Sequence, residues 1–250
     1  METKTRLEAV DSLRGLAILS MILYHGMWDL VFLFGMKIGW YQGLPGMLWQ
    51  QSICWTFIVL AGFSWQLSRS PWKRGLMTLG SGAAVSLVTM AVMPGQEIRF
   101  GILTLLGSCM LLWIPLHKLL KPCPPGWGAG SCMVLFLLTW AGKRLRYARA
   151  ATAWIPEELK SDLALAYLGF PQPGFRSADY FPLIPWIFLF GAGYFACSLL
   201  KNRGLLEKWL SGGRIPGVST LGKHSLLVYL LHQPLLYGLS FLILWMAAQA

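Results

Sequence analysis

The sequence has few charged residues: Asp, Glu, Lys and Arg together make up 12% of its 250 residues. A typical soluble domain has about twice that share. The low charge and the many Leu, Trp and Phe residues exclude intrinsic disorder, a collagen, a coiled coil and a secreted scaffold held by disulfides. The composition therefore directs the analysis to membrane spans rather than to soluble domains.

Cysteine is also scarce. The five cysteines are scattered, and none forms a CxxC pair or a Cys/His spacing typical of metal ligands. We therefore expect neither a zinc site nor a disulfide framework. The N-terminal region has no small-x-small cleavage site after its apolar run, so we expect it to be retained as the first helix.

Long apolar stretches are what the sequence does have. The hydrophobic share is 56% and the mean hydropathy is +0.55. A helix crosses the apolar core of a bilayer, about 30 Å thick, in about 20 residues. Seven stretches have about that length: 13–34, 47–67, 76–93, 100–120, 127–142, 182–200 and 221–247. We predict an all-α polytopic membrane helix bundle of about seven transmembrane helices, organised as one domain over residues 1–250.

Proline, glycine and basic residues modify this pattern. Pro234 interrupts the last stretch, where we expect a kink or a helix in two parts. The fifth stretch is short and is expected to continue into the basic residues 143–149, whose long side chains can snorkel. The connection of residues 142–180 is expected to be an extracytoplasmic loop. Within it, residues 156–168 are predicted to form a short helix that ends before a glycine.

Basic residues predict the orientation in the membrane. The net charge is +11, and the positive residues lie between apolar blocks, so we attribute them to topology and lipid headgroups and not to nucleic acid. With the N-terminus inside, thirteen lie inside: Lys4, Arg6, Arg14, Arg69, Lys73, Arg74, Lys118, Lys121, Lys201, Arg203, Lys208, Arg214 and Lys223. Eight lie outside: Lys37, Arg99, Lys143, Arg144, Arg146, Arg149, Lys160 and Arg176. The bias predicts an N-in, C-out protein, and the basic cluster 143–149 opposes it.

Ionisable side chains in the first apolar stretch are the strongest functional signal. Arg14 and His25 are eleven residues apart, which is about three helical turns plus 20°. Asp29 follows His25 by one turn, so these residues and Asp11 lie near one stripe of the helix. Ionisable groups within a span typically face a functional site. The alternative is that Arg14 anchors the helix at the membrane surface and His25 bonds to a neighbouring helix.

The last apolar stretch gives a second signal. His232 lies about half-way along it, shortly before Pro234. A helix break of this kind persists in a membrane where it lines a cavity or where its backbone finds new partners. A hydrogen bond between helices is the alternative for His232, and we expect His224 and His117 to be loop or interface residues.

Two segments at the predicted outer surface carry polar and aromatic residues. Asp179, Tyr180 and Trp186 lie where the chain enters the sixth span, and Arg99 lies where it enters the fourth. These residues could shape an acceptor site. They could equally anchor the helices in the aromatic belt of the membrane, and the residues alone leave both interpretations open.

Together these segments resemble a family, the heparan-α-glucosaminide N-acetyltransferase-type membrane acyltransferases. The motif Asp11-x-x-Arg14-Gly15-x-Ala17, the Arg14-x10-His25 spacing and Asp29 resemble the family's first helix. The stretch 98–107, the entry Asp179-Tyr-Phe-Pro-Leu-Ile-Pro-Trp186 and the ending Ser225…Tyr229-Leu-Leu-His232 resemble the same family. The match covers most of the chain in order.

The resemblance implies an enzyme that takes an acyl group from cytoplasmic acetyl-CoA and transfers it to an amine or hydroxyl of an extracytoplasmic glycan or amino sugar. It implies His25 as the catalytic histidine, Arg14 as a donor-side residue, Asp29 as the group that orients His25, and His232 as a second polar group. The chemistry that it implies requires no metal. We expect a multi-pass protein of the bacterial inner membrane, and a homodimer stays open.

The residues fit this chemistry. CoA carries several phosphates, which a basic inner mouth formed by Arg14, Arg69, Arg74 and Lys223 would attract. An imidazole can act as a general base on the acceptor, or it can carry the acyl group itself. The alternative function is a small-molecule or proton-coupled transporter, which also needs intramembrane His and Asp residues. The odd number of spans and the absence of a visible repeat oppose a transporter.

Overall fold

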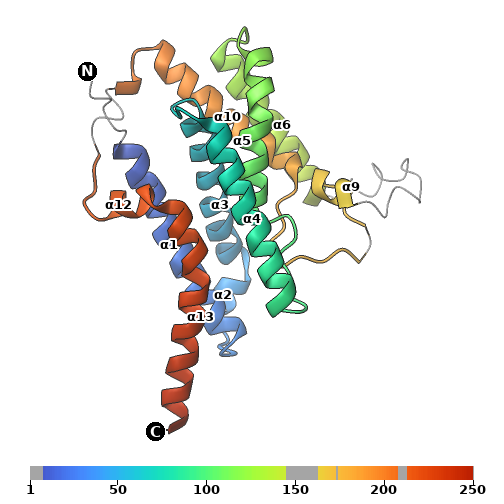
Figure 1. The fold of residues 1–250 in the computed structure, drawn as a ribbon, viewed down its shortest axis with the longest axis vertical. Helices are drawn as coiled ribbons and strands as arrows, with labels where there is room; N and C mark the ends of the chain where they lie inside the picture. The colour runs from blue at the N-terminus through green and yellow to red at the C-terminus, as the bar shows by residue number, and fades with distance from the viewer. Residues whose placement is uncertain (1–7, 145–162, 173, 208–212, 250) are drawn as a thin grey trace. The chain divides into compact units, whose positions relative to one another are not determined.

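The protein is helical throughout the part of the chain that the structure describes. The computed structural model describes residues 8–144, 163–172, 174–207 and 213–249 (Figure 1). Seven helices are long: α1 (Glu8–Phe32), α3 (Leu44–Trp65), α4 (Pro71–Val92), α5 (Ile102–Leu120), α6 (Pro125–Arg144), α10 (Leu183–Asn202) and α13 (Ser225–Gln249). Three are short: α2 (Gly39–Gln42), α9 (Leu163–Leu168) and α12 (Val218–Lys223). The predicted all-α fold is confirmed.

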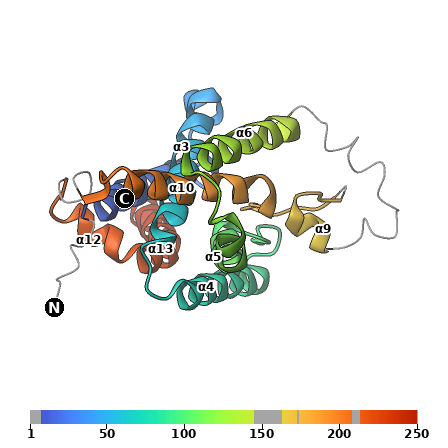
Figure 2. The same cartoon turned by 90° about the horizontal axis from the view of Figure 1, so that it is seen from above.

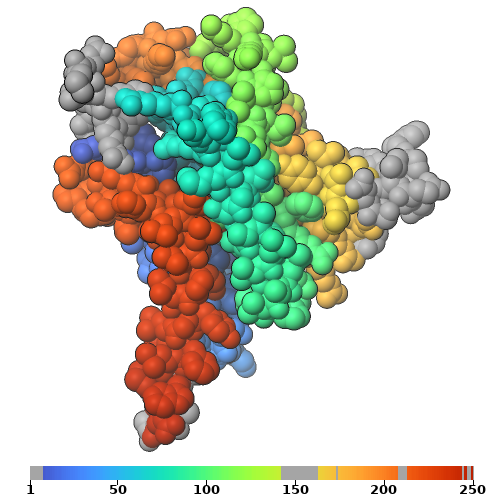
Figure 3. Space-filling model, viewed as in Figure 1, coloured from blue at the N-terminus to red at the C-terminus, as the bar shows by residue number. Residues whose placement is uncertain are grey.

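The long helices correspond one to one with the seven apolar stretches. Five of them, α1, α4, α5, α10 and α13, are long and apolar enough to cross a membrane. Large apolar side chains are exposed along these helices, for example Leu87 and Val88 of α4 and Leu235 and Phe241 of α13. Figure 3 shows the surface of α13 in red. An exposed apolar surface of this kind suits contact with lipid. The chain is an integral membrane protein, and the count of seven spans stays a prediction.

Two helix boundaries differ from the sequence-based expectation, and a third agrees with it. α13 runs through Pro234 as one helix, so the expected division into two parts there is wrong; the chain divides at His224 instead, between α12 and α13. α4 begins at Pro71 and so includes Arg74, because proline fits the first turn of a helix, where its missing N–H leaves no hydrogen bond unmade. α9 forms the described end of the helix expected over residues 156–168, and it stops before Gly169, whose φ is +123°.

The chain divides into two compact units. Unit 1 comprises residues 1–57 and 204–250, and unit 2 comprises residues 58–203. The boundary falls within α3. The organisation as one functional domain stays a prediction.

In unit 1, α12 and the first half of α13 pack along α1 (Figures 1 and 2). The contact with α12 is at backbone distance: a Cβ placed on Gly15 would lie 1.9 Å from the carbonyl oxygen of Val218, and one on Gly222 would lie 1.8 Å from that of Asp11. The Ser12 hydroxyl also accepts a hydrogen bond from the backbone N–H of Ile215 (3.1 Å). Only glycine allows helices to approach this closely.

In unit 2, α5 packs against α4 on one side and α10 on the other, and α6 packs on α10 (Figure 2). Glycines again bring the helices together. A Cβ on Gly107 of α5 would lie 2.5 Å from the backbone nitrogen of Leu79, and a Cβ on Gly193 of α10 would lie 2.1 Å from the carbonyl oxygen of Val59. The core of this unit includes Phe190, which is fully buried.

Candidate functional site

The contact between α1 and α13 brings together the polar residues of both helices. The rings of His25 and His232 are 5.0 Å apart between centroids and meet edge to face. One turn further along α1, the Asp29 carboxylate accepts a hydrogen bond from Gln233 Nε2 (3.3 Å between Oδ1 and Nε2). Asp29 is 1% exposed and His232 is 8% exposed. The sequence predicted three of these residues, and the structure places them together.

Gln233 was not predicted from the sequence. A glutamine beside Pro234 gives no signal of its own in an apolar helix, because an amide is cheaper to bury than a charge. Its position directly after His232 could have suggested that the same helix turn reaches α1. Ser240, about two turns further along α13, also lies near the Asp29 carboxylate.

The hydrogen bond of His232 assigns its tautomer. His232 Nδ1 is hydrogen-bonded to the backbone carbonyl oxygen of Tyr229. A carbonyl oxygen can only accept, so Nδ1 carries the hydrogen and Nε2 of the neutral ring holds a lone pair. This Nε2 atom is buried and has no hydrogen-bond partner among the described residues. The ring is therefore oriented with a free basic nitrogen.

Three buried atoms of this cluster lack a hydrogen-bond donor. They are Asp29 Oδ2, Gln233 Oε1 and His232 Nε2, and no described residue donates to any of them. All three are acceptors, given the tautomer of His232 and the hydrogen bond that Gln233 Nε2 donates. An unsatisfied buried acceptor costs about 1–3 kcal/mol. The cluster is thus suited to a ligand that supplies several N–H or O–H groups.

An aromatic group lies next to this cluster in unit 1. Tyr24 contacts His25 edge to face (5.9 Å between ring centroids) and also packs on Tyr41 and Trp49. The Tyr41 hydroxyl donates to the backbone carbonyl oxygen of Tyr24 (3.0 Å), and burial raises the pKa of this phenol. Trp49 Nε1 donates to the Ser20 hydroxyl (2.8 Å). These contacts fix the position of the Tyr24 ring, which packs on His25.

Arg14 lies near the other end of α1. Its guanidinium forms a partly buried salt bridge with Asp11, 2.9 Å from Nη1 to Oδ1. Lys223 is close in space, because the neighbouring Gly222 packs on Asp11 and Gly15. Arg14 and Lys223 are therefore placed at one end of unit 1, and His25 lies eleven residues away along α1, about 16 Å.

The other two predicted donor residues belong to unit 2, where both are exposed: Arg69 lies in the turn between α3 and α4, and Arg74 lies in the first turn of α4. The start of α4 and the ends of α5 and α10 lie at the same end of unit 2, because residues 93–101 join α4 to α5 and Asp179, just before α10, contacts the start of α5. This end carries seven basic residues: Arg69, Lys73, Arg74, Lys118, Lys121, Lys201 and Arg203. The opposite end carries four described ones: Arg99, Lys143, Arg144 and Arg176. Arg146, Arg149 and Lys160 lie outside the described residues.

The four predicted acceptor-side residues also belong to unit 2, and all of them have structural contacts. Asp179 Oδ2 accepts a hydrogen bond from the backbone N–H of Ile102 (3.1 Å), so it caps the start of α5. Burial raises the pKa of Asp179 to about 6. Trp186 is buried against Phe136 and Phe181. Arg99 is exposed, but its backbone N–H and carbonyl bind the Ser177 hydroxyl.

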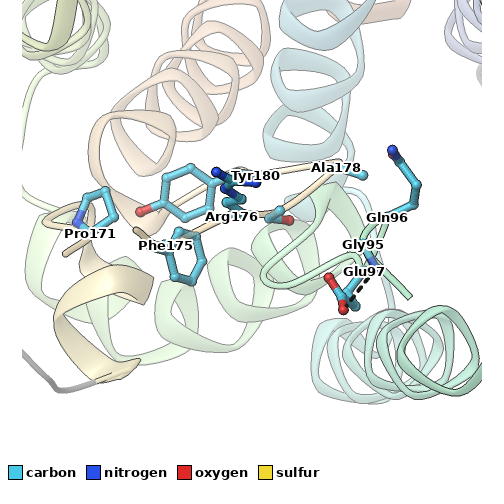
Figure 4. Close-up of a pocket in the computed structure, with 9 residues that line it drawn as sticks. Gly95, Gln96, Glu97, Pro171, Phe175, Arg176, Ala178 and Tyr180 are labelled. Atoms are coloured by element: carbon cyan, nitrogen blue, oxygen red, sulfur yellow. Dashed lines mark hydrogen bonds between the residues drawn. The ribbon is translucent and has the colours of Figure 1, made fainter. Parts of the chain in front are cut away.

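Tyr180, the fourth of these residues, lines a pocket together with residues that the sequence did not single out, such as Glu97 and Arg176 (Figure 4). Exposed loop residues of ordinary polarity give no signal in a sequence. Among the described residues no group of three or more His, Cys, Asp or Glu could hold a metal ion.

The comparisons with known proteins give one match. The family described as heparan-alpha-glucosaminide N-acetyltransferase, catalytic, matches residues 6–234 of the chain. No curated protein and no solved structure matches. The matched range begins before α1 and ends just after Gln233, so it contains every residue of the α1–α13 cluster except Ser240.

Proposed function

We propose that this chain, which belongs to the heparan-α-glucosaminide N-acetyltransferase catalytic family and is thus an integral membrane acetyltransferase, transfers the acetyl group of acetyl-CoA to a primary amine of an extracytoplasmic sugar. Membership of the family gives the acetyltransferase chemistry. The α1–α13 cluster supports the choice of an amine over a hydroxyl.

The observation that carries this choice is the set of three unpaired acceptors. A protonated amine offers three N–H donors, and the cluster offers Asp29 Oδ2, Gln233 Oε1 and His232 Nε2. A hydroxyl offers one donor and would leave at least two of these atoms unpaired. The negative charge of an ionised Asp29 would also compensate the charge of the ammonium group in a buried site.

In this mechanism His232 Nε2 takes a proton from the ammonium group, which frees the nitrogen lone pair. The nitrogen then attacks the thioester carbonyl carbon, the C–N bond forms and the C–S bond breaks, and the CoA thiolate leaves. The second N–H proton that the nitrogen loses as the amide forms goes to the CoA thiolate, which is released as the thiol. His25 lies against His232 and serves either as the group that passes the proton on or as a transient carrier of the acetyl group.

The donor would approach from the end of unit 1 that carries Arg14 and Lys223. We infer that this end faces the cytoplasm, where acetyl-CoA is available. Arg14 would bind phosphate oxygens through its planar guanidinium. Arg69 and Arg74 stay predicted donor contacts, and the bacterial inner membrane stays the proposed location.

The test is a comparison of two acceptors with purified protein in lipid nanodiscs. We expect acetyl-CoA and glucosamine to give an N-acetyl product, detected by mass spectrometry, and glucose, which has a hydroxyl in place of the amine, to give at least about a hundredfold less. His232→Ala should remove the activity and keep the binding of acetyl-CoA. Equal rates with both sugars would contradict the amine assignment, and no transfer to any amine or hydroxyl would contradict the enzymatic function.

A further inference from the structure

A pocket of about 460 Å³ lies at one end of unit 2, and none of the residues of the proposed mechanism lines it (Figure 4). One side is formed by residues 95–97, which precede α5, and the other by residues 171, 175–178 and 180, which precede α10. The volume is within the range of about 300–1,000 Å³ that is typical of small-molecule sites. This is the end that carries few basic residues and that we predict to be extracytoplasmic.

The two loops that form the pocket are fixed to each other. The backbone N–H of Ala178 donates to the carbonyl oxygen of Glu97 (3.0 Å), and that of Phe181 donates to Phe100 (2.8 Å). The Ser177 hydroxyl bridges to Arg99, as described above. These bonds tie two segments that are about 80 residues apart in the sequence. The pocket is therefore largely formed before any ligand binds.

Aromatic rings form one end of the pocket. Phe175 packs on Tyr180, with 5.0 Å between ring centroids, and stacks on Phe100 at an angle of 14°. Phe100 has a φ of +57°, a backbone conformation that a bulky residue adopts only when its surroundings hold it there. The Tyr180 hydroxyl donates to the carbonyl oxygen of Ala166, which fixes the ring at this end of the pocket.

Polar side chains form the other end. Gln96 and Glu97 lie together there, and Arg176 lies between them and the rings (Figure 4). The backbone N–H of Gly95 donates to Glu97 Oε1 (3.1 Å) and lowers the pKa of this carboxyl group, so it is ionised at neutral pH. Glu97 can accept hydrogen bonds from hydroxyl groups and Arg176 can donate them, and both are stronger than neutral bonds because one partner is charged.

We propose that this pocket binds a sugar unit of the glycan acceptor. A pyranose ring has an apolar face of C–H groups, which suits Phe175 and Tyr180, and an edge of hydroxyl groups, which suits Gln96, Glu97 and Arg176. The pairing of aromatic rings with charged hydrogen-bonding groups in one preformed pocket favours such a ligand over a lipid chain, which has nothing to offer the polar end. The identity of the ligand as part of the acceptor rests on the function proposed above.

The first experiment measures binding directly. His25→Ala protein in nanodiscs is titrated calorimetrically with a disaccharide of glucosamine and N-acetylglucosamine, so that turnover cannot interfere. We expect saturable binding, and a loss of affinity of at least about tenfold in Phe175→Ala, Glu97→Gln and Arg176→Gln versions of this protein. Gln172→Ala, in the same loop but outside the pocket, is the matched control and should bind as the parent does.

The second experiment measures the Michaelis constants of the enzyme with the same disaccharide as acceptor. The three pocket variants should raise the KM for the disaccharide several-fold and leave the KM for acetyl-CoA unchanged. If the enzyme acetylates the disaccharide but the pocket variants and the control behave alike in both experiments, the pocket assignment is wrong and the proposed function stands. If no acetyl transfer occurs but the pocket variants still lose affinity, the proposed function is wrong and the pocket binds sugar for another purpose. Absence of saturable binding overturns the pocket assignment.

Discussion

Units 1 and 2 both bury polar side chains among apolar helices, but they differ in how completely these side chains are hydrogen-bonded. In unit 2, Gln66 Nε2 donates to the carbonyl oxygen of Tyr194 (2.9 Å) and to the Ser198 hydroxyl, and the Tyr194 hydroxyl is hydrogen-bonded to His117 Nδ1. In unit 1, Asp29, His232 and Gln233 each keep one buried acceptor atom without a donor. Unit 2 has one comparable atom among its described residues, the Trp113 indole nitrogen, which is a donor.

This difference separates two uses of a buried polar residue. Where neighbouring helices complete every hydrogen bond, the residue holds the helices together and specifies their packing. Where several acceptors are left incomplete at one contact, the helices hold the residues ready for a ligand. A histidine in an apolar helix is thus evidence of a site only when its partners are known.

The largest expected effect contrasts the two histidines. His232→Ala should lower kcat by about a hundredfold or more, because a general base contributes about 10²–10⁴ to the rate. His117→Ala should keep kcat near the wild-type value, since His117 belongs to the saturated network. The rate is measured by acetyl transfer to glucosamine per folded protein. A large loss of kcat in His117→Ala would contradict the distinction between the hydrogen-bond network of His117 and that of His232.

A smaller effect is expected at Asp29. Asp29→Asn keeps the size of the side chain but removes the charge that would bind the ammonium group. Loss of a hydrogen bond to a charged group costs about 1.5–3 kcal/mol, or about ten- to a hundredfold in kcat/KM for the amine. The KM for acetyl-CoA should not change. An effect on acetyl-CoA alone would place Asp29 on the donor side and not on the acceptor side.

Tyr194→Phe tests the saturated network through stability. Removing the hydroxyl leaves His117 Nδ1 without its partner, which should cost about 1–3 kcal/mol of the free energy of unfolding. The loss appears as a lower midpoint in thermal unfolding of the detergent-solubilised protein. Activity per folded molecule should be kept, and a selective loss of activity at unchanged stability would contradict the structural role.

The smallest effect is a pH dependence at the loops of unit 2. Burial raises the pKa of Asp179 to about 6 from an ordinary value of 3.8, so the folded protein binds this proton more tightly than the unfolded chain does. The contribution of Asp179 to stability therefore falls as the pH rises from about 4 to about 6 and is constant above that. Asp179→Asn keeps an oxygen for the N–H of Ile102 and should reduce this slope when thermal unfolding is measured across pH 4–7. An unchanged slope would contradict the assignment of the titration to Asp179.

Much of the fold could be predicted from the sequence, because length and hydropathy alone mark helices that cross a bilayer. We expected the last apolar stretch to divide at Pro234, but it divides at His224. Pro234 lacks an N–H group, but its φ fits a helix and the remaining bonds carry α13 past it. His224, with φ −101° and ψ 25°, ends α12, and α13 begins at the next residue. The short helix α12 could not be predicted, since its stability comes from its contact with α1 and not from its own sequence.

The candidate site could be predicted only in part. Periodicity placed His25 and Asp29 on one stripe of the helix, and the apolar surroundings of His232 singled it out. The pairing of α1 with α13 joins residues about 200 apart in the sequence, which no local pattern encodes. The role of Asp179 could not be predicted for the same reason. Its charge suggested a contact with the substrate, but its carboxylate caps the start of α5, which is distant in the sequence.

The glycines of unit 1 set the alignment of the two histidines. Gly15 and Gly222 meet at backbone distance, and His25 and His232 each follow their glycine by ten residues. Along α1, His25 lies about 15 Å beyond Gly15, and along α13, which begins at Ser225 just after this contact, His232 lies about 10 Å beyond the first residue. A slip of one helical turn, about 5.4 Å, would drive side chains into the backbone at the glycines before it could separate the rings. Two residues without a side chain thus determine how deep in the bilayer the proton is transferred, although both lie far along their helices from the histidines.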